Sequence, residues 1–381
     1  MVPRIQYVRL GRLAAVFACA LLALVAASGA DASRYLQRGV MDDWQVHAYP
    51  DRTFGDLARL RPRVLRILLW WKEVAPSRPE VPTNPADAVY RWQRYDQAVR
   101  RAEAIGMRVL FTIIGTPTWA NGGRSWKFAP RRTLSLRAFA YAAAKRYSGQ
   151  FTDENGILLP PVRLWTAWNE PNLPYFLKVP GAWRYEWRLT RAYALICNAV
   201  VAGAHRAGSE ERLRERVACG VTAPRKKPSL SIAPLAFLRA MKRAGAKFDV
   251  YAHHPYPQAP SDSPTDQPRA RSAVTLGNIG KLVRELTRLY GRKRLWLTEF
   301  GYQTRPDDSF WVSRRQQARY MNEAYALARR HTRIDMLVWF LVRDEPDLNG
   351  SQPGSPGWQS GLITAGGKRK ASYGTFARLP R

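Results

Sequence analysis

The sequence has few residues of the kinds that bind metals. It contains three cysteines and five histidines. No Cys-x-x-Cys pair occurs, and the adjacent His253 and His254 do not have the spacing of two ligands. A glycine-rich phosphate loop and a nucleophilic Ser or Cys elbow are also missing. We therefore expect no metal and no cofactor, and a reaction that relies on other side chains.

One cysteine, Cys19, lies inside an apolar N-terminal run, which leaves Cys197 and Cys219. Cys197 falls in a predicted helix and Cys219 in the predicted strand that follows. The two could therefore meet and form a disulfide in an oxidising compartment. Buried free thiols fit the sequence equally well.

Acidic residues are scarce: 29 Asp and Glu stand against 61 Lys and Arg, which gives a formal net charge of +32. Such a surface attracts polyanions, and nucleic acid, acidic polysaccharide and cell-envelope glycan are the candidates. The arginines are spread over the whole chain and no nucleic-acid-binding motif accompanies them. The composition therefore favours an acidic polysaccharide or envelope glycan over nucleic acid as a partner.

Long hydrophobic runs are missing except at the N-terminus. There Arg4, Arg9 and Arg12 precede an apolar run, 13–27, which is followed by small residues. This order is typical of a secretory signal peptide, which we place at 1–32 with cleavage after residue 30 or 32. An uncleaved anchor is the alternative, but the run is short for a membrane span. We expect the rest, 33–381, to be one secreted or extracytoplasmic domain and a monomer.

In that domain, apolar runs of strand length alternate with segments of helical periodicity. The predicted strands cover 37–44, 64–71, 108–115, 164–170, 216–221, 248–256, 294–299 and 334–341. The predicted helices cover 53–60, 90–105, 134–147, 187–207, 234–244, 278–290, 313–331 and 373–377. Eight strand-helix units in series predict a single (β/α)8 barrel, in which functional residues gather at the C-terminal ends of the strands.

Two of these strands end in a glutamate. The first is Leu-Trp-Thr-Ala-Trp-Asn-Glu-Pro, ending in Glu170, and the second is Leu-Trp-Leu-Thr-Glu-Phe-Gly, ending in Glu299. Pro171 cannot donate to a ladder, so we expect the first strand to stop there. Trp168 would lie beside Glu170, where an apolar surface raises the pKa of a carboxyl group. Although 129 residues separate the glutamates, a parallel barrel brings both strand ends to one face.

Other polar and aromatic residues are predicted at the same face. They are Arg66, Trp119, Asn169, His254, Tyr256 and Trp339. Two carboxyl groups among aromatic side chains suit the cleavage of a glycosidic bond. One protonates the leaving oxygen, while the other attacks the anomeric carbon or activates water. A separation of ~5–5.5 Å between the carboxyls would mean retention of configuration, and ~6.5–9.5 Å inversion.

These motifs resemble clan A of the glycoside hydrolases, the retaining (β/α)8 enzymes. Asn169-Glu170-Pro171 matches the clan's strand-4 motif and Thr298-Glu299-Phe300-Gly301 its strand-7 motif. The stretches Gly115-Thr116-Pro117-Thr118-Trp119 and His254-Pro255-Tyr256 look more like family 39 than family 5. The histidine that usually follows strand 3 or 4 in family 5 has no evident counterpart.

The resemblance implies a role for each residue. Glu170 would be the acid/base and Glu299 the nucleophile. Arg66 would keep Glu299 ionised, Tyr256 would position it, and Asn169 would bind the sugar 2-hydroxyl. Trp339 would form the floor beneath the reacting sugar. Independently of the resemblance, only one of His253 and His254 can face inward in an alternating strand, and the Pro-Tyr that follows favours His254. Trp119 would stack on a sugar or only cover the barrel mouth.

Two other functions remain open on the sequence alone. One is a barrel that binds carbohydrate without cleaving it, which would more naturally have lost one of the glutamates. The other is a basic protein that binds polyanions and uses the barrel as a scaffold, with steeply salt-dependent binding and no hydrolysis.

Overall fold

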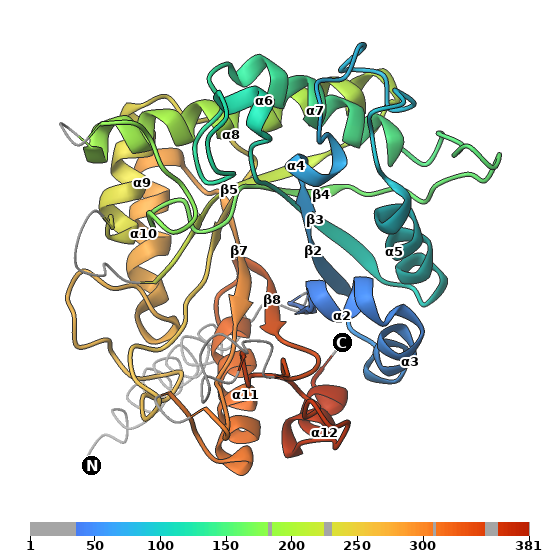
Figure 1. Ribbon diagram of the computed structural model, residues 1–381. Coiled ribbons are helices and arrows are strands. Elements are labelled where there is room, and N and C mark those ends of the chain that lie inside the picture. Colours follow the sequence, from blue (N-terminus) through green and yellow to red (C-terminus); the bar gives the residue numbers. More distant parts are fainter. Residues whose placement is uncertain (1–35, 182–184, 225–230, 308–309, 347–356, 381) are drawn as a thin grey trace, which may run out of the picture.

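The computed structural model describes residues 36–181, 185–224, 231–307, 310–346 and 357–380 (Figure 1). The predicted signal peptide, 1–32, lies outside these residues. Within the described ranges, eight parallel strands hydrogen-bond in sequence order into a closed barrel. The strands are β1 (Gln37–Met41), β2 (Val64–Trp70), β3 (Arg108–Ile114), β4 (Leu164–Ala167), β5 (Arg216–Thr222), β6 (Val250–His253), β7 (Arg294–Phe300) and β8 (Ile334–Phe340). The predicted (β/α)8 barrel is confirmed.

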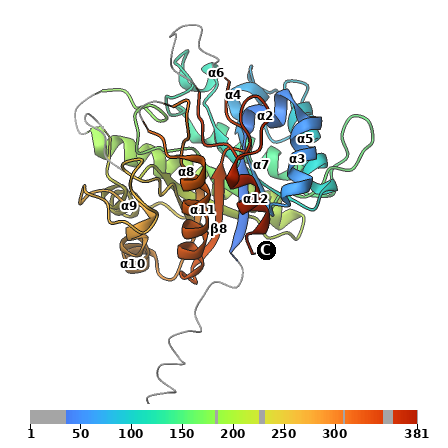
Figure 2. The same ribbon diagram turned by 90° about the horizontal axis from the view of Figure 1, so that it is seen from below.

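Helices surround the barrel in both views (Figures 1 and 2). The longer ones are α3 (Pro50–Leu60), α5 (Gln93–Ala104), α7 (Thr133–Arg146), α8 (Tyr185–Glu210), α9 (Pro234–Arg243), α10 (Ile279–Tyr290), α11 (Arg314–Arg329) and α12 (Ala371–Arg378). Each corresponds to a predicted helix. Short helices that were not predicted are α2 (Asp43–Ala48), α4 (Trp71–Val74), α6 (Thr118–Asn121) and the 3₁₀ turn η1 (Leu276–Asn278).

The hydrophobic core has two layers, one inside the barrel and one between strands and helices. Every strand contributes to the inner layer, which includes Met41, Val64, Leu110, Leu164, Ala218, Val250, Trp296 and Met336. The outer layer is larger and contains the helix-facing residues of the same strands. Because both faces of each strand are covered, the strands are continuously apolar, as is usual in parallel sheets.

The outer layer is closely packed where α7 meets α8. Gly203 of α8 lies against the backbone of α7, and a Cβ atom there would lie 2.4 Å from the carbonyl oxygen of Arg137. Only a residue without a side chain permits this approach. Cys197, which precedes Gly203 on α8, forms a disulfide with Cys219 of β5, with 5.9 Å between their Cα atoms. The sequence had left this pairing open.

The inner layer becomes polar toward the C-terminal ends of the strands. Arg66 follows Val64 on the inward face of β2 and is fully buried. Its Nε donates to Oγ1 of Thr112 on β3 at 3.0 Å, and Thr166 of β4 donates to the same oxygen at 2.6 Å. A buried guanidinium is costly unless its donors are satisfied. This layer therefore fixes Arg66 beneath the face where the strands end.

No helix among the described residues is both long and apolar enough to span a bilayer.

Candidate active site

Glu170 enters the site because β4 ends early. The strand stops at Ala167, three residues before the end predicted at Glu170. Trp168 (φ 70°) and Glu170 (φ 38°) both take left-handed backbone conformations, which are uncommon for residues with side chains. The amide of Glu170 then donates to the carbonyl of Val221 on β5 at 2.9 Å. The chain turns within these residues, so the extended conformation expected up to Pro171 is wrong.

Asn172 holds this turn in place. It is fully buried, and its side-chain oxygen accepts from the amide of Ala223 at 2.9 Å. Its Nδ2 donates to the carbonyl oxygens of Ala223 and Ile232, at 3.3 and 3.0 Å. One amide side chain thus ties the turn after β4 to the segment after β5. Asn172 directly follows the Asn169-Glu170-Pro171 motif, but its role depends on contacts about 50 residues away in the sequence, which the motif does not reveal.

Glu299 enters the site through an irregularity in β7. Leu297 pairs with Leu337 of β8, whereas Phe300 pairs with Trp339, so three steps on β7 correspond to two on β8. This extra residue is a β-bulge, which re-aims side chains. As a result two consecutive residues reach the site: Oγ1 of Thr298 lies 3.0 Å from Nε2 of His254, and Glu299 contacts Arg66.

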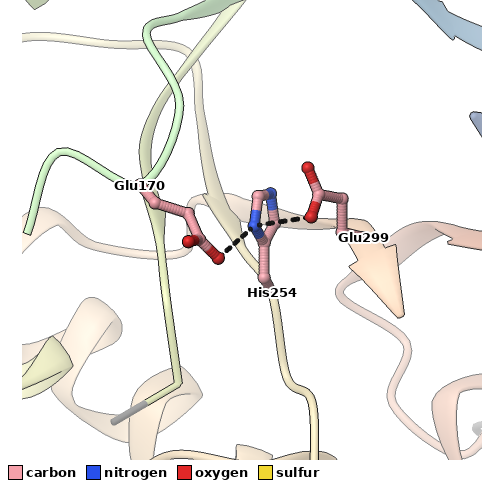
Figure 3. A group of neighbouring side chains, drawn as sticks. All are labelled: Glu170, His254 and Glu299. Atoms are coloured by element: carbon pink, nitrogen blue, oxygen red, sulfur yellow. Dashed lines mark hydrogen bonds and ion pairs between the residues drawn. The ribbon is translucent and has the colours of Figure 1, made fainter. Parts of the chain in front are cut away.

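The two glutamates meet on either side of His254 (Figure 3). Nδ1 of His254 lies 3.0 Å from Oε1 of Glu170 and 3.5 Å from Oε2 of Glu299. One oxygen of each carboxylate and one ring nitrogen lie within 4.8 Å of one another. Both glutamates are largely buried, with about a tenth of each side chain exposed. Two carboxyl groups distant in the sequence therefore lie side by side, joined through one imidazole.

Glu299 is held by two further donors. Nη1 of Arg66 donates to its Oε1 at 2.5 Å, and the hydroxyl of Tyr256 donates to its Oε2 at 3.2 Å. Burial raises the pKa of Tyr256 well above its usual range, so this hydroxyl keeps its proton. Nη2 of Arg66 donates to Oδ1 of Asn169 at 2.7 Å. The structure thus brings five of the predicted residues, Arg66, Asn169, His254, Tyr256 and Glu299, into one network with Glu170.

His254 faces the site and His253 faces away from it, as the alternation of the strand predicts. His253 contacts Oγ1 of Thr222 at 2.8 Å and the carbonyl of Val274 at 3.0 Å. Burial is the largest cause that lowers the pKa of His254, to about 3, and the nearby Arg66 lowers it further. Glu299 acts in the opposite direction but less strongly. The imidazole is therefore neutral near pH 7 and has one N–H to donate.

Trp339 does not lie where the resemblance placed it. It is fully buried in the outer layer, and its Nε1 donates to the carbonyl of Ser360 at 2.9 Å. The inward residues of β8 are Met336, Val338 and Phe340, which pack on the inner layer. Because side chains alternate along a strand, the aromatic residue at the inward C-terminal position is Phe340. The prediction that Trp339 forms the floor of the sugar site is therefore wrong.

Trp119 lies on α6, and its described contacts are with the segment that follows β2. Its Nε1 donates to the carbonyl of Ala75 at 2.9 Å, and its ring packs edge-on against Trp71 at 5.6 Å between centroids. These contacts join the loops after β2 and β3. Of the two roles considered for Trp119, the contacts described fit a covering of the barrel mouth.

Glu170, His254 and Glu299 are also the only group of three in the described ranges whose atoms could coordinate a metal ion. Two carboxylates and an imidazole are a suitable donor set. However, the guanidinium of Arg66 already lies 2.5 Å from Oε1 of Glu299 and supplies the compensating positive charge. A divalent cation bound to Glu299 would be repelled by it.

Comparisons with known proteins agree with this geometry. The family model described as "Glycosyl hydrolase catalytic core" matches residues 235–357, a range that includes His254, Tyr256 and Glu299 but not Glu170. No curated protein sequence matches the chain significantly.

Solved structures with the same fold include several glycosidases. A family 39 glycoside hydrolase from Bacteroides cellulosilyticus has a TM-score of 0.62 and 20% identity, over 91% of this chain and 63% of that one. A monomeric β-xylosidase from Caulobacter crescentus has a TM-score of 0.59 and 18% identity, over 91% and 68%. A fungal β-1,4-galactanase has a TM-score of 0.58 and 16% identity, over 91% and 100%.

At these identities the structural matches show a shared fold, and the chain spans less than two thirds of the Bacteroides enzyme. Together with the matched catalytic core, they confirm the resemblance to barrel-fold glycoside hydrolases that the two strand-end motifs indicate. Family 39 enzymes are among the structural neighbours.

Proposed function

We propose that the protein is a retaining glycoside hydrolase that cleaves β-linked O-glycosides by double displacement. The observation that supports this most directly is the approach of Glu170 and Glu299, with an oxygen of each within 4.8 Å. Carboxyl groups of retaining enzymes are about 5–5.5 Å apart, and those of inverting enzymes are further apart by the width of a water. The neighbours of the two carboxyls differ in a way that suits different roles.

Glu299 is the nucleophile in this proposal. The guanidinium of Arg66 and the hydroxyl of Tyr256 stabilise its anion and fix its orientation. In the first step its carboxylate attacks the anomeric carbon while the bond from that carbon to the leaving oxygen breaks. The proton of Glu170 passes to the leaving oxygen. A covalent glycosyl-enzyme results, and Glu170 becomes a carboxylate.

In the second step, Glu170 takes a proton from a water molecule. The water oxygen attacks the anomeric carbon, the bond to Glu299 breaks, and both carboxyl groups return to their starting states. In this proposal Asn169, whose Oδ1 accepts from Arg66, binds the sugar 2-hydroxyl. Two displacements at one carbon retain its configuration.

Neutral His254 accommodates both protonation states of Glu170. In this proposal the imidazole proton is on Nδ1 and is donated to Oε1 of Glu170 at 3.0 Å, while Nε2 accepts from the hydroxyl of Thr298 at 3.0 Å. Glu170 carries its acid proton on Oε2, so Oε1 accepts from Nδ1–H whether Glu170 is protonated or ionised. The proton cycle of Glu170 therefore requires no change of tautomer and no movement of the ring.

We also propose that the enzyme acts outside the cytoplasm. The basic and then apolar sequence of 1–32 supports export. The Cys197–Cys219 disulfide supports an oxidising compartment. Fractionation of cells that express the full chain, with N-terminal sequencing of the mature protein, tests this directly. A protein recovered from the cytoplasm with an intact N-terminus would contradict it.

Replacement of the two glutamates tests the mechanism. Glu170→Gln should lower the hydrolysis of ordinary glycosides about 10²–10⁴-fold, because proton donation is lost. It should still form the glycosyl-enzyme from aryl glycosides with a good leaving group, seen as a burst of the released phenol. Glu299→Gln should lose both steps with either substrate. Glu103→Gln, an exposed acid on α5, is the matched control and should behave like the parent.

The anomeric configuration of the first product, followed by NMR, completes this test. Retention supports double displacement, and inversion contradicts it. If either glutamine variant hydrolyses ordinary glycosides at the parent rate, the assignment of that glutamate is wrong. Binding of glycans without hydrolysis by the parent protein would favour the non-catalytic barrel instead.

A further inference from the structure

A row of four aromatic side chains runs along the rim of the site, and it takes no part in the chemistry above. The aromatic row consists of Trp70, Trp126, Phe176 and Tyr175. Ring centroids are 5.1 Å apart between Trp70 and Trp126, 6.5 Å between Trp126 and Phe176, and 4.9 Å between Phe176 and Tyr175. Tyr175 has 63% of its surface exposed, and the other three rings are partly exposed.

The two ends of the row lie on segments that also carry active-site residues. Trp70 ends β2, the strand that carries Arg66. Tyr175 and Phe176 follow Glu170 in the turn after β4, where the amide of Leu173 donates to the carbonyl of Glu170 and the amide of Phe176 to that of Leu173. Trp126 joins them from the loop after α6, and helix α6 lies beside α4 in both views (Figures 1 and 2). A glycan bound across the glutamates could therefore extend over the row.

Two lysines lie against these rings. Nζ of Lys127 is 4.0 Å from the ring centroid of Tyr175 and 5.4 Å from that of Trp126. Nζ of Lys72 is 5.2 Å from the centroid of Trp70 and forms an ion pair with Glu73 at 3.2 Å. The ammonium of Lys127 has no carboxylate partner among the described residues. A cation held by aromatic faces and without a counter-ion can accept an anion from a ligand.

The two loops that carry Trp126, Tyr175 and Phe176 are free of acidic residues. Residues 115–133 contain Arg124, Lys127, Arg131 and Arg132, and 171–181 contain Lys178, with no Asp or Glu in either segment. The loops on the opposite side of the barrel mouth do contain acids, among them Asp262, Asp266, Asp344 and Glu345. The positive potential is therefore concentrated on the side of β3 and β4 and is not a uniform property of the mouth.

We propose that the aromatic row is a subsite for an anionic sugar of the substrate, such as a uronic acid, whose ring stacks on Trp126 and Tyr175 while its charged group pairs with Lys127. This rests on the proposed glycosidase function and specifies its substrate class as an acidic glycan. Aromatic faces bind the apolar face of a sugar ring whatever its charge. Lys127 adds the preference for an anion.

Equilibrium binding tests the subsite separately from catalysis. The background is Glu299→Gln, so that no substrate is consumed. The probes are a glucuronic-acid-containing oligosaccharide, its carboxyl-reduced neutral counterpart and the neutral counterpart carrying sulfate esters, all in 0.15 M NaCl. The uronate and the sulfate should each bind about fivefold more tightly than the neutral form, which is the size of one favourable partly exposed ion pair.

Variants identify where the preference arises. Lys127→Gln should remove most of it, whereas Lys281→Gln, an exposed lysine on α10 with the same change of charge, should leave it intact. Tyr175→Ala should weaken all three probes. Equal losses in Lys127→Gln and Lys281→Gln would overturn the subsite and assign the preference to the overall net charge. Equal binding of charged and neutral probes would overturn it as well.

Hydrolysis by the parent protein separates the two proposals. If neutral β-glycosides are cleaved and the anion preference is missing, the subsite fails and the proposed function stands. If no glycoside of either kind is cleaved but the preference depends on Lys127, the subsite stands and the proposed function fails.

Discussion

Two neighbouring aromatic residues at the end of β8 differ in the surface that they present. Trp339 is fully buried and anchors the loop after β8 through the carbonyl of Ser360. Phe340 is only partly buried on the inward side and packs edge-on against Trp358 at 5.7 Å. The side of the strand on which an aromatic residue lies therefore indicates contact with a sugar better than its residue type does.

These environments predict different effects of substitution. Phe340→Ala should lower kcat/KM about 10–100-fold, because it removes roughly 1.5–3 kcal/mol of apolar contact from the substrate side. Trp339→Phe should lower the free energy of unfolding by about 1–3 kcal/mol, since the carbonyl of Ser360 loses a buried donor. Its kcat/KM, corrected for the folded fraction, should stay close to that of the parent. Steady-state kinetics and urea unfolding of both variants measure this, and the reverse pattern would restore Trp339 to the sugar site.

At the scale of secondary structure, the sequence predicted the barrel and most element boundaries. Buried strands and amphipathic helices have periodicities that can be recognised locally. The early end of β4 and the bulge in β7 could not be predicted in this way. The turn at Trp168 depends on Val221 and Asn172, and the bulge before Phe300 depends on pairing with β8. Such features are set by residues far away in the sequence.

The same limit explains which site residues were found. Glu170, Glu299 and Arg66 were recognisable as polar residues interrupting apolar strands. Thr298 was not singled out, because in a regular strand only one of Thr298 and Glu299 would face inward. The short helices α2, α4 and α6 have four to six residues, too few to produce a periodic pattern.

The disulfide joins α8 to β5, and its removal should lower stability without changing catalysis. It closes a loop with a sequence separation of 22 between α8 and β5. Cys197→Ala combined with Cys219→Ala should lower the free energy of unfolding by about 3 kcal/mol, mostly through the unfolded chain. Both sulfurs lie on the helix-facing side of the sheet, so kcat/KM should not change.

A reductant provides the control for this prediction. Dithiothreitol should lower the midpoint of thermal unfolding in the parent but not in the double variant. If the double variant unfolds at the same midpoint as the oxidised parent, the disulfide does not stabilise the fold. A loss of kcat/KM without a loss of stability would instead link Cys219 to the site through β5.

For the molecule as a whole, the excess of positive charge means that acidification should lower the stability of the folded protein. Protonation of carboxylates adds to a formal charge of +32 and increases self-repulsion. Buried histidines act in the same direction. Burial lowers the pKa of His47 to about 4 and that of His253 to about 3, against about 6.5 in an unfolded chain. Buried Asp42, whose pKa burial raises to about 7, acts in the opposite direction.

His253 allows one of these contributions to be isolated, because it lies outside the catalytic network. Between pH 6.5 and about 3 the unfolded chain binds a proton at this position and the folded protein does not. The free energy of unfolding should therefore fall, by about 1.4 kcal/mol per pH unit for this group, as the pH decreases through that window. His253→Gln has no group that titrates there. Its stability relative to the parent should thus improve steadily from pH 6.5 to pH 4.5 in urea unfolding curves, while above pH 7.5 the difference between the two proteins should be constant. A difference that does not change with pH would mean that His253 is protonated in the folded protein and that its contacts with Thr222 and Val274 do not keep it neutral.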